Sequence, residues 1–376
     1  MRRPTLTDIV REWGRIGCLG FGGPPAHIAM LRDLCVVRRR WLSNEDFENA
    51  IAATSLLPGP ASTQLAIYCA WRLRGTAGAL VGGFCFIAPS VVVILALSVA
   101  FLASSPPAWL RGAGAGAGAA VAAVALHAGA SLAPPIWARS APDQRARIVL
   151  YAVAGATAAA SVGPWLVFVL LGCGTVELVW RRGALRGLPA LLAVVPAGAG
   201  LGALAWVAFK VGALSFGGGF VIIPLMQGDA VGTYHWMTNG QFLNAVALGQ
   251  VTPGPVTATV AAVGYAAHGI GGGVLAAAVA FAPSFSFILL GAKRFHRLIA
   301  DARVQGFLAG AAPAAVGAIV GSAIPLTRAL GETWQFAVLA AAVLLLFVLR
   351  RGVVLTLVAA GAAGAIVALA GGPLPR

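Results

Sequence analysis

Leu56-Leu-Pro-Gly-Pro-Ala-Ser-Thr-Gln64 interrupts an apolar, helical segment that extends from about residue 47 to residue 71. Proline lacks a backbone N–H and its ring clashes with the preceding turn, so the helix must break at Pro58-Gly59-Pro60. A break inside a membrane is tolerated only where the freed backbone groups are buried in protein or line a cavity. Val251-Thr-Pro-Gly-Pro-Val-Thr257 breaks a second apolar segment, residues 242–267, in the same way. Two matched broken helices are the best sequence indication of a transporter's binding site.

The composition is that of a helical membrane protein with many spans. The chain has 376 residues, of which 59% are hydrophobic and 10% are charged. Apolar runs at residues 76–103, 113–133 and 353–371 are long enough to cross a bilayer. The sequence therefore predicts an all-α polytopic membrane protein.

The formal net charge is +15, and nearly all of the basic residues are arginine. In a soluble protein this charge would suggest a nucleic-acid partner. Here the basic residues occupy short loops between apolar runs, which is the positive-inside pattern and also attracts anionic lipid. We expect the lipid bilayer, and no nucleic acid, as the partner. The five cysteines and five histidines are scattered, so neither a metal site nor a cofactor is predicted.

Motifs recur at a spacing of 195 residues, which indicates an internal duplication. Phe21-Gly22-Gly23 corresponds to Phe216-Gly217-Gly218, and Pro58 corresponds to Pro253. After the loss of one residue, Ala88-Pro-Ser90 aligns with Ala282-Pro-Ser284. The predicted units are a first repeat at residues 1–186, a linking transmembrane helix at 187–205 and a second repeat at 206–376.

Two further positions in each copy have the spacing of a helix N-cap. Ser43 and Asp46 precede the first broken helix, and Thr238 and Gln241 precede the second. In a capping box the first side chain accepts a hydrogen bond from the backbone N–H of the second residue. The sequence therefore predicts that both broken helices begin at these positions.

The basic loops indicate how each copy is oriented in the membrane. Arg38-Arg-Arg40 and Arg72-Leu-Arg74 have no basic counterparts in the second copy, whereas Lys293-Arg-Phe-His-Arg297 corresponds to a sparse loop near Arg111. By the positive-inside rule the copies are inverted, with the N-terminus in the cytoplasm. The predicted fold has two inverted-topology repeats with broken, re-entrant helical hairpins, and about nine crossings.

The residues around the breaks suit a small anion. Broken helices expose N–H groups at half-helix N-termini, where the dipole favours negative charge. Neutral hydroxyl and amide donors suit a tetrahedral oxyanion, although coordination of a cation and simple capping of freed carbonyls in a kinked helix stay open. The predicted substrate-binding residues are Gly22, Gly23, Pro58, Gly59, Pro60, Ser62, Thr63, Gln64, Ser215, Gly217, Gly218, Gln250, Thr252, Pro253, Gly254, Pro255 and Thr257.

These motifs resemble those of the long-chain chromate ion transporter family, over nearly the whole chain. Its first half is similar to Phe21-Gly-Gly-Pro-Pro-Ala-His27, Trp41-Leu-Ser43, Leu56-Leu-Pro-Gly-Pro60 and Ala88-Pro-Ser90. Its second half is similar to Ser215-Phe-Gly-Gly-Gly219, Ile223-Pro-Leu225 and Gly249-Gln-Val-Thr-Pro-Gly-Pro255. The resemblance implies an inner-membrane protein that exports chromate, confers chromate resistance and binds sulfate as a chemical mimic.

Other functions remain to be weighed against this one. A passive anion channel, or a transporter of another small anion, fits the same hairpins. An intramembrane enzyme would need a nucleophile–base pair or a metal cluster, and no spacing supplies one, so the sequence predicts no enzyme. We expect Glu48 and Glu177 to be interfacial charges, which leaves proton antiport open. The small residues from Gly112 to Gly118 favour plain helix packing and permit a homodimer.

Overall fold

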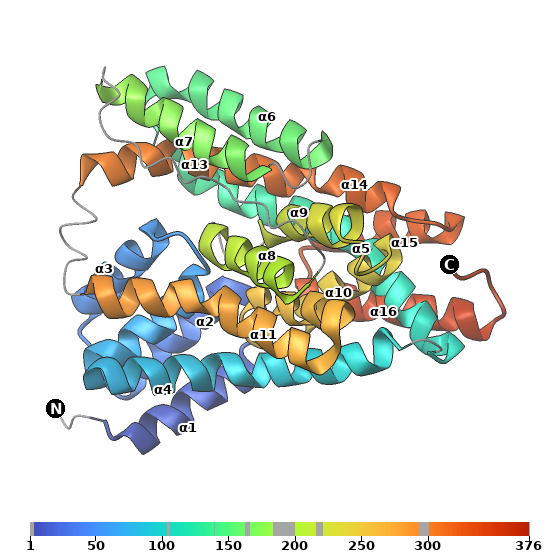
Figure 1. Cartoon of the computed structure of the whole chain (residues 1–376), viewed down its shortest axis with the longest axis horizontal. Coiled ribbons are helices and arrows are strands. Elements are labelled where there is room, and N and C mark those ends of the chain that lie inside the picture. The colour runs from blue at the N-terminus through green and yellow to red at the C-terminus, as the bar shows by residue number, and fades with distance from the viewer. Residues whose placement is uncertain are drawn as a thin grey trace.

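The computed structural model describes residues 4–103, 106–138, 140–161, 166–182, 200–215, 221–292 and 301–375. Within these ranges the chain forms helices and no strand (Figure 1). In the described part of the chain, four helical stretches are long and apolar enough to cross a membrane: Ala61–Phe101, Ala108–Ala138, Val256–Gly291 and Ala302–Arg328. The predicted all-α polytopic membrane protein is confirmed.

Both predicted helix breaks are present. In the first half, helix α3 ends at Leu56 and α4 begins at Ala61. In the second half, α10 ends at Val251 and a 3-10 turn begins at Val256. Two helices precede the broken segment in each half. In order, the first half has α1 (Leu6–Leu19), α2 (Gly23–Arg32), α3 (Asn44–Leu56) and α4 (Ala61–Phe101), and the second half has α8 (Leu201–Leu214), α9 (Ile222–Gln227), α10 (Asn239–Val251) and α11 (Val260–Gly291).

The predicted N-caps are also confirmed. The Ser43 hydroxyl accepts a hydrogen bond of 3.0 Å from the Asp46 backbone N–H at the start of α3. At the start of α10, Thr238 and Gln241 form a reciprocal capping box. Each cap satisfies N–H groups that the first helical turn leaves unpaired, so it fixes where the broken helix begins.

Helix α4 is folded back on itself as a hairpin. Its backbone leaves helical geometry at Arg74 and Gly75, where Gly75 has a φ of 60°. Beyond this turn, a Cβ on Gly83 would lie 2.8 Å from a side-chain carbon of Ile67, so the two arms are antiparallel. The first arm is about 20 Å long at 1.5 Å per residue, which is too short to cross a bilayer.

Helix α11 repeats this hairpin. Its non-helical residues are His268 and Gly269, and Gly269 has a φ of 63°. A Cβ on Gly273 would lie 2.8 Å from the Ala261 carbonyl oxygen, which again places the two arms against each other. The long helices after both breaks are therefore short arms followed by full-length spans.

The elements of the two halves recur at the predicted spacing. The bounds of α8 are those of α1 displaced by 195 residues, and α10 begins 195 residues after α3. Two π-helical turns, Asp33–Arg38 and Gly228–Thr233, keep the same offset. Most of the predicted linking helix, residues 187–205, lies outside the described residues, and the repeat boundaries stay predictions.

The remaining helices lie around the two broken segments. In Figure 1, α6, α7 and α13 lie along one side of the molecule, α8 to α11 lie centrally, and α1 and α4 lie on the opposite side. A smaller apolar core among α6, α7 and α13 is separate from the main core around the breaks. These helices are α5 (Ala108–Ala138), α6 (Arg145–Ser161), α7 (Leu166–Arg182), α13 (Ala302–Gly321), α14 (Ala323–Arg328), α15 (Thr333–Val343) and α16 (Val353–Leu369).

Glycines on α5 let two helices approach closely. A Cβ on Gly116 would lie 2.9 Å from the Gly364 Cα on α16, and one on Gly118 would lie 2.9 Å from the Leu243 Cβ on α10. Small residues permit such close backbone contact, which supplies van der Waals packing between membrane helices. The helix-packing interpretation of residues 112–118 is confirmed.

Gly116→Leu is expected to destabilise the protein because the new side chain has no room against α16. Its Cβ would also collide with the Ala360 carbonyl oxygen. Overpacking of this kind costs about 1–3 kcal/mol or more. Thermal unfolding in detergent should therefore shift to a lower temperature. Gly172→Leu is the control, because Gly172 is exposed on α7 and a Cβ there would have no atom within 4 Å; equal melting temperatures would contradict the close contact.

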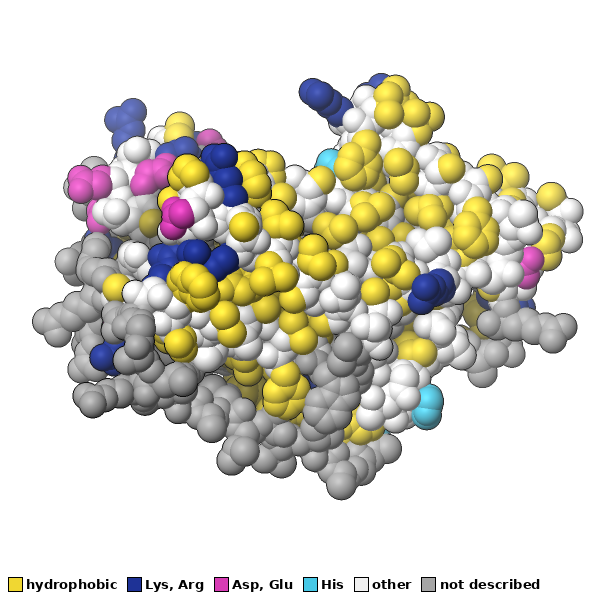
Figure 2. All heavy atoms as spheres, turned by 90° about the horizontal axis from the view of Figure 1, so that it is seen from above, with side chains coloured by type: hydrophobic (Ala, Val, Ile, Leu, Met, Phe, Trp, Pro, Cys, Tyr) yellow, Lys and Arg dark blue, Asp and Glu magenta, His cyan; other side chains and the backbone are white. Residues whose placement is uncertain are grey.

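Acidic and basic side chains are most concentrated at one end of the face shown in Figure 2. On the face shown in Figure 2, acidic and basic side chains lie together at the left, and hydrophobic side chains dominate the middle. Arg32 pairs with Glu48, which is half exposed.

Glu177 differs from the expected interfacial charge because it is buried. Arg147 lies at 2.9 Å from its carboxylate, Arg181 at 2.8 Å and the Tyr151 hydroxyl at 3.1 Å. The arginines on α6 and α7 that cover it could not be assigned to it by sequence.

Candidate functional site

The first break lies against the second half of the chain. A Cβ on Gly59 would lie 3.1 Å from the Gly212 carbonyl oxygen on α8 and 3.5 Å from the Ser284 Oγ on α11. Gly59 has a φ of 117°, a conformation that glycine adopts readily and other residues rarely adopt. The turn therefore needs glycine both for its backbone angle and for its close contact with α8.

The second break lies against the first half. A Cβ on Gly254 would lie 2.8 Å from the Ser90 Cβ on α4 and 3.5 Å from the Gly17 carbonyl oxygen on α1. The Gly254 N–H donates a hydrogen bond of 2.9 Å to the Gly20 carbonyl oxygen. Gly254 has a φ of 96°, so this turn has the same backbone requirement.

The two sets of contacts are equivalent in the sequence. Gly212 is the counterpart of Gly17 at an offset of 195, and Ser284 is the counterpart of Ser90 after the lost residue. The first break therefore contacts Gly212 and Ser284, and the second break contacts their counterparts, Gly17 and Ser90. Reciprocal contacts of this kind are characteristic of a two-fold relation. They bring the two Pro-Gly-Pro turns into one central region.

All of the predicted hydroxyl and amide side chains are buried. They come from the starts of α4 and of the 3-10 turn after the second break, and from the ends of α8 and α10. These residues are Ser62, Thr63, Gln64, Ser215, Gln250, Thr252 and Thr257. Desolvation of a polar group costs free energy unless it is hydrogen-bonded, so the partners of each side chain decide its role.

Two of these side chains cap the freed backbone. The Gln64 Nε2 donates to the Pro58 carbonyl oxygen at 2.7 Å, and the Thr252 hydroxyl donates to the Leu248 carbonyl oxygen at 2.7 Å. For these two groups the simple capping interpretation holds. They stabilise the broken helix ends without help from a ligand.

Other polar atoms in the same region are buried and have no hydrogen-bond partner. They include the hydroxyls of Thr63, Ser215 and Thr257, the Gln64 Oε1 and the Gln250 Nε2. A buried group left unsatisfied costs about 1–3 kcal/mol, so such groups are uncommon in folded proteins. Their concentration at the two breaks is typical of a site that is completed by a polar ligand or by water.

The glycines of the first Phe-Gly-Gly motif lie at the N-terminus of α2. Gly22 is its N-cap, with a φ of 99°, and a Cβ on Gly23 would lie 3.9 Å from the Val256 side chain just beyond the second break. Gly217 and Gly218 lie outside the described residues. Pro58, Pro60, Pro253 and Pro255 belong to the turns themselves.

Sequence reasoning missed several residues of this region. Ser90 and Ser284 served only to align the two copies, yet each contacts the opposite break. His27 was not among the predicted site residues, yet its ring is within hydrogen-bonding distance of Ser62, with 3.3 Å between Nδ1 and Oγ. The recurring Ala-Pro-Ser motif was the available signal for the serines; nothing in the sequence paired His27 with Ser62.

A buried ion pair lies in the second half. The Lys210 Nζ on α8 is 2.6 Å from the Asp229 Oδ2, and the two side chains are 10% and 4% exposed. Lys210 is the one Lys or Arg that is buried within the ranges the structure describes. The Lys210 ammonium also lies 5.9 Å from the centre of the Trp206 ring. Lys210, paired with Asp229, lies on α8 five residues before Ser215.

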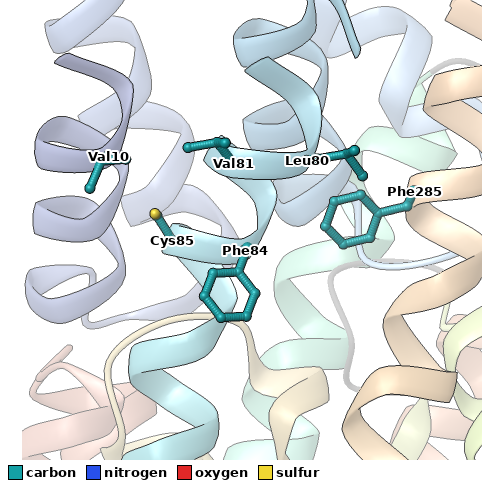
Figure 3. Close-up of a pocket in the computed structure, with 6 residues that line it drawn as sticks. All are labelled: Val10, Leu80, Val81, Phe84, Cys85 and Phe285. Atoms are coloured by element: carbon teal, nitrogen blue, oxygen red, sulfur yellow. The ribbon is translucent and has the colours of Figure 1, made fainter. Parts of the chain in front are cut away.

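A groove on the surface is unrelated to the predicted site. It has a volume of about 570 Å³ and contains none of the predicted residues (Figure 3). Phe84, which forms part of the wall of the groove, is 68% exposed. Such an apolar surface offers no hydrogen-bond donor to an oxyanion. The groove is lined by Val10, Leu80, Val81, Phe84, Cys85 and Phe285.

Comparison with known proteins gives consistent matches. A family model described as chromate transporter matches residues 7–178 and 202–365. The chromate transport protein of Cupriavidus metallidurans is 31% identical over 86% of this chain and 83% of its own length. The chromate transport protein of Pseudomonas aeruginosa is 28% identical over 94% of this chain and 90% of its own length. A probable chromate transport protein of Synechococcus elongatus is 29% identical over 86% of this chain and 85% of its own length. No solved structure matches.

Proposed function

Because the chain belongs to the chromate transporter family, we propose that it is a secondary transporter, and not an enzyme, that exports chromate across the inner membrane. Export would confer resistance to chromate, and sulfate would compete as a dianion of the same tetrahedral shape. The names of the relatives support the substrate class. The site proposed for the anion is the region between the two Pro-Gly-Pro turns.

The observation that carries this proposal is the set of unpaired polar groups at the breaks. The Thr63, Ser215 and Thr257 hydroxyls and the Gln250 amide nitrogen are potential donors in a buried region. A hydrogen bond to a charged acceptor is worth about 1.5–3 kcal/mol. Several neutral donors can therefore hold a dianion without a salt bridge to arginine. The half-helix that begins at Ala61 adds backbone N–H groups and a favourable dipole.

Export of a dianion is favourable in a cell with an inside-negative membrane potential. Each elementary charge gains about 2.3 kcal/mol per 100 mV, so a dianion gains about 4–5 kcal/mol. This free energy is sufficient to drive net export without a coupling ion. We propose that the potential drives net export through the site.

The reciprocal contacts at the breaks support a mechanism with two related states. Gly59 lies against α8 and Gly254 lies against α1, so each half holds the other's turn in place. Inverted repeats provide alternating access when one repeat rocks relative to the other. We propose two inverted repeats with the N-terminus in the cytoplasm, and an anion site that opens to each side in turn.

Chromate uptake into inside-out vesicles tests this function. We expect saturable uptake that sulfate inhibits, and loss of uptake in a Ser62→Ala, Thr63→Ala, Thr257→Ala triple variant. Each lost hydrogen bond to a charged group should lower the affinity about tenfold or more. Uptake equal to that of empty vesicles would contradict chromate transport, and uptake that does not saturate would indicate a channel.

A matched triple variant controls for the loss of three hydroxyl groups. Ser131, Thr157 and Ser161 are exposed on α5 and α6, and each hydroxyl bonds to a carbonyl of its own helix. Their replacement by alanine should leave chromate uptake unchanged. Equal losses in both triple variants would show that the effect does not come from the site.

A further inference from the structure

His27 is fully buried beside the first break. On helix α2, its Nε2 lies 2.9 Å from the Gly20 carbonyl oxygen and its Nδ1 lies 3.3 Å from the Ser62 Oγ. The edge of the ring packs against Phe86 on α4, with 5.1 Å between ring centres. The imidazole is therefore held on three sides, and one of its contacts is a residue of the proposed anion site.

The partners of the ring determine where its proton lies. A carbonyl oxygen only accepts, so the Nε2 that faces Gly20 must carry a hydrogen. In the neutral imidazole the Nδ1 then has no hydrogen and accepts one from the Ser62 hydroxyl. This hydrogen bond commits the proton of Ser62 to His27. While His27 is neutral, Ser62 cannot use that proton to bind an anion.

We infer that His27 is a positioning residue that decides whether Ser62 can donate a hydrogen bond to the oxyanion, an inference that rests on the proposed function. When Nδ1 gains a proton it becomes a donor to the Ser62 oxygen. The hydroxyl proton of Ser62 then turns away from the ring and is free for the anion. Binding of the dianion and protonation of His27 therefore favour each other.

The surroundings of His27 restrict the linkage between its protonation and anion binding to the imidazole and the Ser62 hydroxyl. Helix α1 presents the Gly20 carbonyl to the ring, and α4 presents Ser62 and Phe86. Within the described residues no acidic or basic side chain interacts electrostatically with the imidazole. Histidine is the side chain whose ordinary titration range lies nearest neutral pH, so a bound dianion is well suited to bring about its protonation.

The two halves differ at this point. The counterpart of His27 at the offset of 195 is Ile222, which has no proton to exchange. The counterpart of Ser62 is Thr257, whose buried hydroxyl has no hydrogen-bond partner. The second break therefore presents a hydroxyl that is always free, and the first presents one that is released by a proton.

The sign of the pH dependence follows from the linkage. Because the anion binds the protonated form more tightly, its apparent affinity falls as the pH rises. The slope for one linked proton is at most about tenfold per pH unit. Sulfate is the probe, since it remains a dianion throughout the range, whereas chromate changes its own protonation near neutral pH.

The experiment measures the sulfate concentration that halves the uptake of trace chromate, far below its saturating concentration, from about pH 5 to about pH 8.5, a range that includes the ordinary histidine pKa of about 6.5. We expect this concentration to rise with pH for the wild type. It should be independent of pH for His27→Gln, whose amide can keep both hydrogen bonds but does not titrate. It should also be independent of pH for Ser62→Ala, which keeps the imidazole and removes the group through which it acts.

His268→Gln provides the matched control, because His268 is exposed at the turn of α11. This variant should keep the pH dependence of the wild type. A Ser62→Ala variant that retains the full pH dependence would overturn the inference while leaving chromate transport established. Absence of chromate uptake by the wild type would instead overturn the proposed function.

A spectroscopic measurement tests the proton's position without relying on transport. In protein labelled with nitrogen-15 at histidine, His27→Gln identifies the His27 signals. At high pH the ring should be the Nε2–H tautomer, and added sulfate should convert it to the doubly protonated ring at a higher pH than in its absence. An Nδ1–H tautomer, or a titration that sulfate does not shift, would contradict the inference.

Discussion

Gly59→Ala and Gly254→Ala are each expected to abolish transport and to lower stability by several kcal/mol. A non-glycine residue at a positive φ costs about 1–3 kcal/mol, and the φ values here are 117° and 96°. Contact adds to this strain. A Cβ on Gly59 would lie 2.6 Å from the Gln64 Nε2, and one on Gly254 would lie 2.8 Å from the Ser90 Cβ.

Two other glycines separate backbone strain from contact. Gly75→Ala carries the strain of a φ of 60° at the turn of α4, where no atom lies within 4 Å of the new Cβ. Gly202→Ala on α8 carries neither strain nor contact. We expect the melting temperature to be highest for Gly202→Ala, lower for Gly75→Ala and lowest for Gly59→Ala and Gly254→Ala. Wild-type uptake by Gly254→Ala would contradict the close approach of the second break to α4.

Lys210→Met alone and Asp229→Leu alone are expected to be strongly destabilising. Each leaves one buried charge without its partner, and breaking a buried pair in this way costs about 3–5 kcal/mol. The double variant should recover most of the loss, since replacing both charges by apolar side chains is often neutral or stabilising. Melting temperatures of the two single variants and the double variant in detergent measure the coupling.

The exposed pair of Arg72 and Asp46 is the control for this cycle. Its side chains are 41% and 44% exposed, although its 2.7 Å separation resembles that of the buried pair. Exposed ion pairs contribute about 0–1 kcal/mol, so either single substitution there should have little effect. A Lys210→Met variant with the melting temperature of the wild type would show that the pair of Lys210 and Asp229 is not desolvated.

Local chemistry made the breaks, the turns and the caps predictable from sequence. Pro58-Gly59-Pro60 and its counterpart remove hydrogen-bond donors wherever they occur, so the helix must stop. Ser43 and Thr238 act on residues three positions away, within the same turn. Recurring motifs then indicated the spacing at which the helices of the two halves repeat.

The partners of buried polar groups were not predictable, because they are set by contacts between distant helices. The motif at residues 215–219 and helix α9 lie between Lys210 and Asp229 in the chain, and no spacing rule in the sequence pairs the two residues. The buried Glu177 has three partners, two of them from α6 and one from α7. His27 and Ser62 are 35 residues apart and meet only because α2 packs beside the start of α4.

The most direct test of the proposed anion site is to locate the anion itself. Anomalous scattering from crystals grown with chromate, or with selenate as a heavier analogue of sulfate, would mark its position. We predict a peak between the two breaks, within hydrogen-bonding distance of the Thr63 and Thr257 hydroxyls. A peak confined to the arginines at the charged end, with the region between Gly59 and Gly254 unoccupied, would contradict the site.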